Sequence, residues 1–194
     1  MNGESKIHWD QKYEQGLPSL TRPDPFFLSA YARFAVQVFP NAGTALDIAG
    51  GLGRHALWLA QQNWQVSVVD VSEVALRKLG EAAKDRHVDL GLVQADAADY
   101  SFEPARFDLI VLFYHLDRRL FPRIVTALKP GGLFFCKLRA QWASDASPTA
   151  GALLGRNELA LRLPEFVVFD QQQRPVGDRG VVEYVGRKPT YAGR

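Results

Sequence analysis

Alternating strand-like and helix-like runs between residues 44 and 139 constrain the fold of this chain more than any other feature of its sequence. The strand-like runs are TALDIA, QVSVVD, DLGLVQ, FDLIVLF and GLFFCKL, and they are apolar on both faces. Strands of a parallel sheet that is covered by helices have this pattern. The helix-like runs among them are RHALWLAQQN, SEVALRKLGEAAKDR and RLFPRIVTALK. This order predicts an α/β fold with a doubly wound, mostly parallel sheet.

The segments on either side of this core complete the prediction. In residues 140–194, a loop is expected at QWASDASPTAG, a helix at RNELALRLPEF, and two strands at EFVVFDQQQ and GVVEYVGRKP, joined through RPVGDRG. Two strands joined by a turn predict an antiparallel pair at one edge. The sequence therefore predicts a Rossmann-like, seven-stranded sheet with helices on both faces and an antiparallel edge strand.

Residues 1–43 are predicted to be helical. A short helix is expected at IHWDQKYEQG, and a second helix follows Asp24, which is predicted as its N-cap, with Pro25 at the first helical position. Phe27, Tyr31, Phe34 and Val38 would form an apolar stripe on this second helix. Since the 194 residues contain no repeat, low-complexity segment or domain-sized linker, we expect a single domain over residues 1–194.

Composition excludes several classes of function. The net charge is +2 and the basic residues are dispersed, which argues against a nucleic-acid partner. No apolar run approaches the length that spans a bilayer, and the first ten residues lack the apolar stretch of a signal peptide. We therefore expect a cytoplasmic protein that does not bind membranes. The lone cysteine, Cys136, lies in an apolar run and is expected to be buried and inert; no metal site is expected.

A glycine-rich turn follows the first predicted strand and raises the question of the cofactor. The turn GLGRHA, residues 51–56, matches the dinucleotide pattern G-x-G-x-x-G/A, and a helix N-terminus presents N–H groups to a ligand. Asp47 lies four residues before Gly51, where it would face the pyrophosphate of a dinucleotide, an unfavourable pairing of like charges. S-adenosylmethionine carries an ammonium group and no phosphate, so Asp47 favours that cofactor.

Two further aspartates end the next two predicted strands. Asp70 can accept hydrogen bonds from ribose hydroxyls of either cofactor. Asp96 can accept from an adenine amino group, while Ala97 offers its backbone N–H to the ring. Ligands of open α/β sheets bind at the carboxyl ends of strands, where these aspartates are expected. Each could instead be an ordinary turn or cap residue.

The residues LDIAGGLGRHALWLA, VSVVDVS, VQADAADYSFEPARFDLIVLFYHL and LKPGGLFF resemble the successive motifs of class I S-adenosylmethionine-dependent methyltransferases. The resemblance covers residues 44 to about 138. It implies that the methionine moiety is held by Asp47, Gly51 and Gly53, the ribose by Asp70, and the adenine by Val71, Asp96 and Ala97. Ala49 replaces the first glycine of the family motif, and we expect its methyl group to narrow the pocket slightly. In a similar variant of the motif, an asparagine stands where this chain has His55.

The N-terminal HWDQKYEQG and RPDPFFL resemble small bacterial methyltransferases of the tellurite-resistance and thiopurine methyltransferase group. On this resemblance residues 1–43 form a helical cap, 44–139 the cofactor-binding core, and 140–194 the substrate-side loop and edge strands. It implies that Trp9 and Tyr13 cover the cofactor and that Arg22 lies near an anionic substrate. The alternative is that Trp9 and Tyr13, four residues apart, are the apolar face of a short helix.

The run LFYHLD follows the fourth predicted strand, where the resemblance places the transferred methyl group. Phe113 and Tyr114 are candidates to line the site, with Phe113 on the cofactor side. His115 is a candidate base, and Tyr114 a second candidate catalytic residue, although His115 could equally be an ordinary loop histidine. Arg139 and Trp142 are candidates for binding the acceptor.

The resulting hypothesis is a methyltransferase that acts on a small-molecule acceptor by direct in-line transfer, as a monomer or homodimer. Two alternatives stay open, a non-catalytic S-adenosylmethionine-binding regulatory protein and an NAD-dependent oxidoreductase. The sequence does not specify the acceptor atom.

Overall fold

The computed structural model describes residues 3–16, 21–141, 153–155, 157–176 and 179–190. Trp142 lies outside these residues. The chain divides into two compact units, Met1–Ser101 and Phe102–Arg194. The single-domain organisation stays a prediction.

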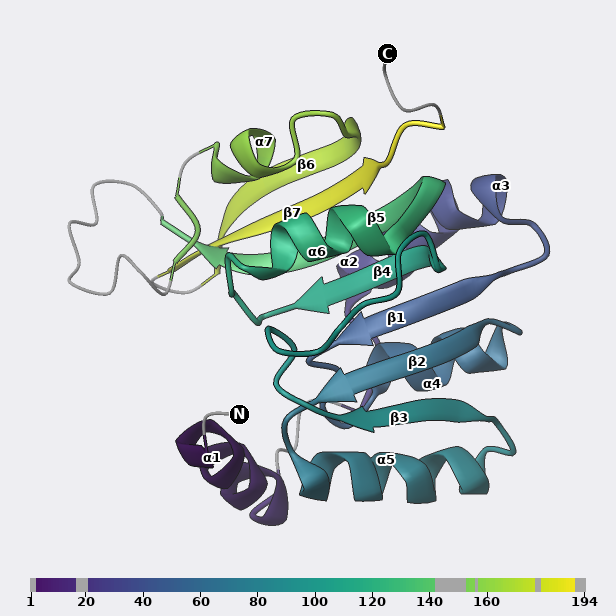
Figure 1. Cartoon of the computed structure of the whole chain (residues 1–194), viewed down its shortest axis with the longest axis vertical. Helices are drawn as coiled ribbons and strands as arrows, with labels where there is room; N and C mark the ends of the chain where they lie inside the picture. The colour runs from purple at the N-terminus through teal and green to yellow at the C-terminus, as the bar shows by residue number, and fades with distance from the viewer. Residues whose placement is uncertain (1–2, 17–20, 142–152, 156, 177–178, 191–194) are drawn as a thin grey trace. The chain divides into compact units, whose positions relative to one another are not determined.

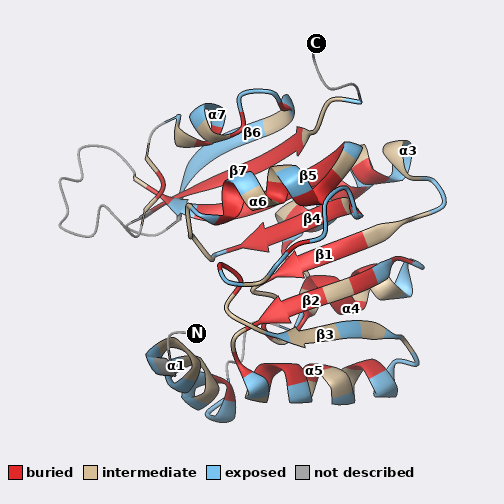
Figure 2. Ribbon diagram, in the orientation of Figure 1, coloured by how far each residue is buried: buried red, intermediate tan, exposed pale blue. Residues whose placement is uncertain are grey.

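The first unit contains three parallel strands, β1 (Thr44–Ile48), β2 (Gln65–Asp70) and β3 (Leu90–Gln94), in the order β3-β2-β1 (Figure 1). Helix α4 (Arg54–Gln61) packs against β1 and β2, and α5 (Glu73–Asp85) packs against β2 and β3. Most of β1 and β2 is buried, as Figure 2 shows, because both strands carry apolar residues on both faces. The strand-turn-helix predicted around the glycine turn is confirmed.

The N-terminal segment begins with α1 (Gly3–Glu14) and continues with α2 (Pro25–Ala30), a π-helical turn η1 (Tyr31–Ala35) and α3 (Val36–Val38). The N-cap prediction is confirmed, because the Asp24 side chain accepts a hydrogen bond from the Phe26 N–H at 2.9 Å.

The predicted apolar stripe is only half right. Phe27 and Tyr31 are buried, whereas Phe34 and Val38 are partly exposed. The π-turn inserts one extra residue per turn, with the Val36 N–H donating to the Tyr31 carbonyl oxygen. The wider turn rotates the residues that follow, so that Ala35 is fully buried in place of Phe34.

The second unit contains β4 (Phe107–Phe113), β5 (Leu128–Ala140), β6 (Val167–Val176) and β7 (Arg179–Arg187), in the order β4-β5-β7-β6. The β4–β5 pair is parallel, and β7 runs antiparallel to both β5 and β6. The antiparallel edge is therefore confirmed. Helix α6 (Leu120–Ala127) connects β4 and β5, and α7 (Glu158–Arg162) precedes β6. Helix α7 is shorter than the predicted run of 156–166.

Together the strands and helices of the two units have the Rossmann-like α/β composition that the sequence predicts, with seven strands, most of them parallel. Among the described residues, no helix is long and apolar enough to cross a membrane. Cys136 is buried, as expected, and burial raises the pKa of its thiol above the usual range.

Candidate functional site

The loop between β1 and α4 adopts a left-handed backbone at three positions. Ala49, Gly51 and Gly53 have φ angles of 53°, 55° and 70°. Gly53 closes the turn by donating its N–H to the Gly50 carbonyl oxygen at 2.9 Å. A Cβ at Gly53 would collide with Leu79 of α5, so this glycine is required by packing as well as by its φ angle.

Ala49, which replaces the first glycine of the motif, has a strained backbone conformation. Its N–H donates to the Val69 carbonyl oxygen at 2.8 Å, which holds the residue in the left-handed region. A non-glycine residue in this region costs about 1–2 kcal/mol. The structure thus identifies backbone strain at Ala49; the expected narrowing of the pocket stays a prediction.

Asp47 is a buried carboxyl group beside this loop. The residue is 2% exposed, and its Oδ2 has no hydrogen-bond partner. Burial, with a smaller contribution from the charge of Asp70, raises the pKa of Asp47 to about 7, while Arg54 and the Ala56 N–H oppose the rise. A Cβ at Gly50 would lie 3.1 Å from Asp47 Oδ2, so the backbone of the turn closely approaches this oxygen. A cationic or hydrogen-bond-donating ligand group would satisfy it.

Asp70 connects the glycine turn to the start of α5. Its Oδ2 accepts the Gly51 N–H at 2.8 Å and its Oδ1 accepts the Ser72 N–H at 2.9 Å. These two hydrogen bonds fix the orientation of the Asp70 carboxylate at the end of β2. The structure therefore places Asp47 and Asp70 at the carboxyl ends of neighbouring parallel strands, as predicted.

Tyr13 brings helix α1 to the same turn. The side chain is buried, and a Cβ at Gly51 would collide with its hydroxyl. Burial and the charges of Asp70 and Asp47 raise the pKa of Tyr13 above its usual value, so the phenol is neutral at physiological pH. The Trp9 ring stacks on Tyr13, with centroids 5.8 Å apart. Tyr13 therefore contacts the glycine turn and does not only form the apolar face of a short helix. A direct contact of Trp9 or Tyr13 with the cofactor stays a prediction.

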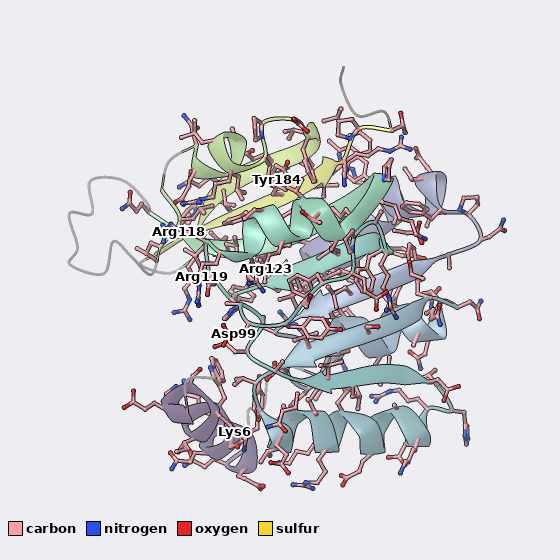
Figure 3. The ribbon with its side chains drawn as sticks, in the orientation of Figure 1. Lys6, Asp99, Arg118, Arg119, Arg123 and Tyr184 are labelled. Atoms are coloured by element: carbon pink, nitrogen blue, oxygen red, sulfur yellow. The ribbon has the colours of Figure 1, made fainter. Side chains whose placement is uncertain are left out.

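A hydrogen-bond network that sequence reasoning missed fixes α1 on α5. Asp10 Oδ1 accepts the Ser72 Oγ–H at 2.6 Å and the Val74 N–H at 3.3 Å. Lys6, on α1 in Figure 3, pairs with Asp10 at 2.7 Å and with Glu73 at 3.3 Å. Ser72 thus links Asp10 to Asp70, since its N–H donates to Asp70 and its hydroxyl to Asp10.

His55, which replaces the asparagine of the related motif, is also structural. It is buried, its Nε2 accepts the Asp24 N–H at 3.3 Å, and its ring lies 4.6 Å from that of Phe27. This contact fixes the start of α2 next to the helix that follows the glycine turn. Arg22, two residues earlier, is exposed.

The predicted adenine-contact residues follow β2 and β3. Asp96 Oδ1 accepts the Ala98 N–H at 3.0 Å, so the aspartate organises its own turn. Ala97 is buried and Val71 is partly buried. The turn role of Asp96 is thus observed, and its contact with adenine stays a prediction.

In the second unit, Tyr114 occupies a strained position directly after β4. Its φ angle is 59°, its side chain is exposed, and its N–H donates to the Lys137 carbonyl oxygen at 2.7 Å. Strained backbone of this kind is concentrated at functional sites. Phe113 is buried, with its ring 6.4 Å from that of Tyr114, and His115 is partly buried. Arg139 is exposed near the carboxyl end of β5.

Comparison with known proteins identifies the central part of the chain. Residues 45–132 match the family model of a methyltransferase domain. The ubiquinone/menaquinone biosynthesis C-methyltransferase UbiE of Brucella anthropi is 28% identical over 135 residues, which cover 57% of this chain and 51% of the relative. The chain thus spans about half the length of the curated relatives it matches.

Solved structures agree on the fold. TehB from Haemophilus influenzae superposes with a TM-score of 0.72 at 16% identity, over 94% of this chain and 66% of that one. The N-methyltransferase NodS from Bradyrhizobium japonicum, in complex with S-adenosylhomocysteine, gives 0.68 at 21% identity, over 93% and 98%. These similarities define a Rossmann-like α/β protein. Residues 45–132 are thus similar to a methyltransferase domain, and the solved structures share the Rossmann-like fold.

Proposed function

We propose that this chain transfers the sulfonium methyl group of S-adenosylmethionine directly to a nucleophilic atom of a small molecule and releases S-adenosylhomocysteine. The observation that carries the proposal is the buried Asp47 oxygen without a hydrogen-bond partner beside the glycine turn. The ammonium group of the methionine moiety would pair with this oxygen, whereas a pyrophosphate would be repelled by it.

The remaining cofactor contacts follow the strand ends. In our proposal Asp47, Gly51 and Gly53 hold the methionine moiety and Asp70 holds the ribose. The adenine lies against Val71, Asp96 and Ala97. The position of Asp70 supports this assignment, because the backbone N–H groups of Gly51 and Ser72 orient its two carboxylate oxygens beside the glycine turn.

The cofactor, when bound, supplies an electrophilic methyl group on a positively charged sulfur. The chain has to orient the acceptor and exclude water, which contribute more to such a transfer than a base does. We propose that Trp9 and Tyr13 cover the cofactor, with Phe113 beside it, and that Tyr114 and His115 act in catalysis. The proposal does not depend on His115 as a base, because a soft anionic acceptor needs none.

A small acceptor is supported by the short connections between most of the helices and strands. The curated relatives are named for C-methylation in ubiquinone and menaquinone biosynthesis, which also concerns small molecules. We propose Arg22, Arg139 and Trp142 as acceptor-binding residues. A monomeric or homodimeric, cytoplasmic protein without nucleic-acid partners completes the proposal.

The test is turnover. Purified protein is incubated with methyl-labelled S-adenosylmethionine and a panel of thiols, small phenols, selenite and tellurite, and labelled product is measured. Product from at least one acceptor is expected. Tight cofactor binding without product from any acceptor would favour the regulatory alternative, and binding of NAD without binding of S-adenosylhomocysteine would favour the oxidoreductase.

A further inference from the structure

Ser72, between β2 and α5, joins three parts of the first unit through its hydrogen bonds. The residue is fully buried, and its N–H donates to Asp70 Oδ1 at 2.9 Å. Its Oγ accepts the Ala75 N–H at 3.1 Å, and its Oγ–H donates to Asp10 Oδ1 at 2.6 Å. Because a hydroxyl has one proton and the Ala75 N–H can only donate, the proton of Ser72 is directed to Asp10. The end of β2, the start of α5 and helix α1 are therefore connected at one side chain.

Asp10 uses both carboxylate oxygens to connect α1 with α5. Besides Ser72, Oδ1 accepts the Val74 N–H at 3.3 Å in the first turn of α5, and Oδ2 lies 2.7 Å from Lys6 Nζ. Burial acts to raise the pKa of Asp10, but the hydrogen bonds from Lys6 and Ser72 outweigh burial and lower it. The carboxylate is therefore ionised at neutral pH, and a negative charge stabilises a helix at its N-terminus. Helix α1 thus caps α5, beside which it lies in Figure 1.

Tyr13 makes a second contact from the same side of α1. Asp10 and Tyr13 are three residues apart, a spacing that brings two side chains to one face of a helix. The Tyr13 carbonyl oxygen accepts a hydrogen bond from Lys78 Nζ at 2.7 Å, which holds this turn of α1 on α5. The Tyr13 hydroxyl lies over Gly51, where a Cβ would collide with it. One face of α1 therefore contacts both α5 and the glycine turn.

These contacts form a closed ring around the carboxylate of Asp70. Its Oδ2 accepts the Gly51 N–H at 2.8 Å, and its Oδ1 accepts the Ser72 N–H at 2.9 Å. Tyr13 covers the first of these donors. Asp10, on the same helix, accepts the hydroxyl proton of the second. Docked α1 therefore restrains both backbone groups that orient Asp70, and both restraints are lost together if α1 moves away.

We propose that Asp10 is a positioning residue of the cofactor site, which acts through Ser72 to hold the Asp70 carboxylate in the orientation that binds the ribose. Docking of α1 and binding of the cofactor then stabilise each other, because each favours the same arrangement of Ser72 and Gly51 around Asp70. This inference rests on the proposed function for the assignment of Asp70 to the ribose, and it is tested by binding, without turnover.

The first measurement is calorimetric titration of the full chain and its variants with S-adenosylhomocysteine. Asp10→Ala removes the acceptor of Ser72 and Val74 and should weaken binding about fivefold to tenfold. Asp10→Asn keeps an oxygen that can accept both hydrogen bonds, so its affinity should stay within about twofold of wild type. Glu14→Gln, which breaks only an exposed pair between the same two helices, is the matched control and should change nothing. Thermal melts check that each variant is folded.

A ribose-specific measurement separates positioning of Asp70 from general loosening of α1. The second probe is the 2′-deoxy analogue of S-adenosylhomocysteine, which lacks one of the hydroxyl groups that Asp70 would accept. Wild type should bind the parent compound about tenfold more tightly than the analogue, because a hydrogen bond to a charged group is lost. In Asp10→Ala this preference should fall to about threefold or less. A merely structural role of Asp10 would weaken both compounds equally and leave the preference unchanged.

The reciprocal effect is measured by amide hydrogen exchange. If docking of α1 strengthens cofactor binding, S-adenosylhomocysteine must in turn favour docked α1. Saturating S-adenosylhomocysteine should therefore slow exchange of the α1 amides in wild type severalfold, and the slowing should be smaller in Asp10→Ala. Glu14→Gln should behave as wild type does.

The outcomes distinguish this inference from the proposed function. Binding to wild type that Asp10→Ala leaves unchanged, an equal loss for both compounds in Asp10→Ala, or a loss in Asp10→Asn as large as that in Asp10→Ala would overturn the inference alone. Absence of S-adenosylhomocysteine binding to wild type would overturn the proposed function and this inference with it.

Discussion

The hydroxyl of Tyr13 lies directly over the backbone of Gly51, so closely that a methyl group at Gly51 would collide with it. Helix α1, far from the glycine turn in sequence, thereby closes over the turn that follows β1. The side chains around this contact are Asp47, Asp70 and Arg54, whose charges all act on Tyr13.

Gly51→Ala should therefore lower the free energy of unfolding for two reasons. The φ angle of 55° is strained for alanine, which costs about 1 kcal/mol, and the new methyl group displaces Tyr13. Urea unfolding of Gly51→Ala, Tyr13→Ala and the double variant tests this. We expect the double variant to be more stable than the sum of the single effects predicts, because Tyr13→Ala removes the colliding atom. Strict additivity would contradict the contact.

Asp47 predicts an unusual dependence of stability on pH. Its pKa is raised from 3.8 to about 7 in the folded state, so the folded protein binds a proton that the unfolded chain has already lost. The free energy of unfolding should fall as pH rises from about 4 to about 7, by a few kcal/mol. In Asp47→Asn this fall should be absent. Urea titrations at pH 5 and pH 8 measure it, and an equal fall in both proteins would refute the assignment to Asp47.

Ala49→Gly should stabilise the protein by up to about 1 kcal/mol, because relief of left-handed strain exceeds the entropy that glycine adds to the unfolded chain. Ala82→Gly within α5 is the matched control and should destabilise by about 1 kcal/mol. Thermal melts compare the two. Destabilisation by Ala49→Gly would mean that backbone strain at this position contributes little to the stability of the protein.

Asp10→Ala should loosen α1. The change removes the acceptor for Ser72 Oγ and the Val74 N–H, and it removes the ion pair with Lys6. Amide hydrogen exchange in α1 should accelerate about tenfold or more, which corresponds to the loss of roughly 1.4 kcal/mol. Glu81→Gln, which breaks only the exposed pair with Arg77 inside α5, is the control. Unchanged exchange in Asp10→Ala would show that α1 is held by other contacts.

Much of the fold could be predicted because its signals are local. Apolar runs of strand length, the cap at Asp24 and the motif around Gly51 each depend on residues close together in sequence. The antiparallel edge could be predicted because two strand-like runs are joined by one short turn. The π-turn at Tyr31–Ala35 could not be predicted this way, because one extra residue in a turn leaves the local composition unchanged.

Of the candidate site, only the residues at the ends of strands could be predicted from the sequence. Asp47 and Asp70 stand out because they terminate strands beside the turn, whereas Asp10 resembles any exposed helix residue until α1 meets α5. Lys137 and Glu183 are distant in sequence, and only the β5–β7 register opposes them. Such pairings depend on tertiary contacts, which override local patterns.

The most direct test of the account is calorimetric titration of the protein with S-adenosylhomocysteine and, separately, with NAD. We predict binding of S-adenosylhomocysteine and none of NAD. Asp70→Ala should weaken the binding at least about tenfold, or 1.4 kcal/mol, while Asp85→Ala, an exposed carboxylate at the end of α5, should leave it unchanged. Binding of NAD without S-adenosylhomocysteine, or full affinity in Asp70→Ala, would contradict the account.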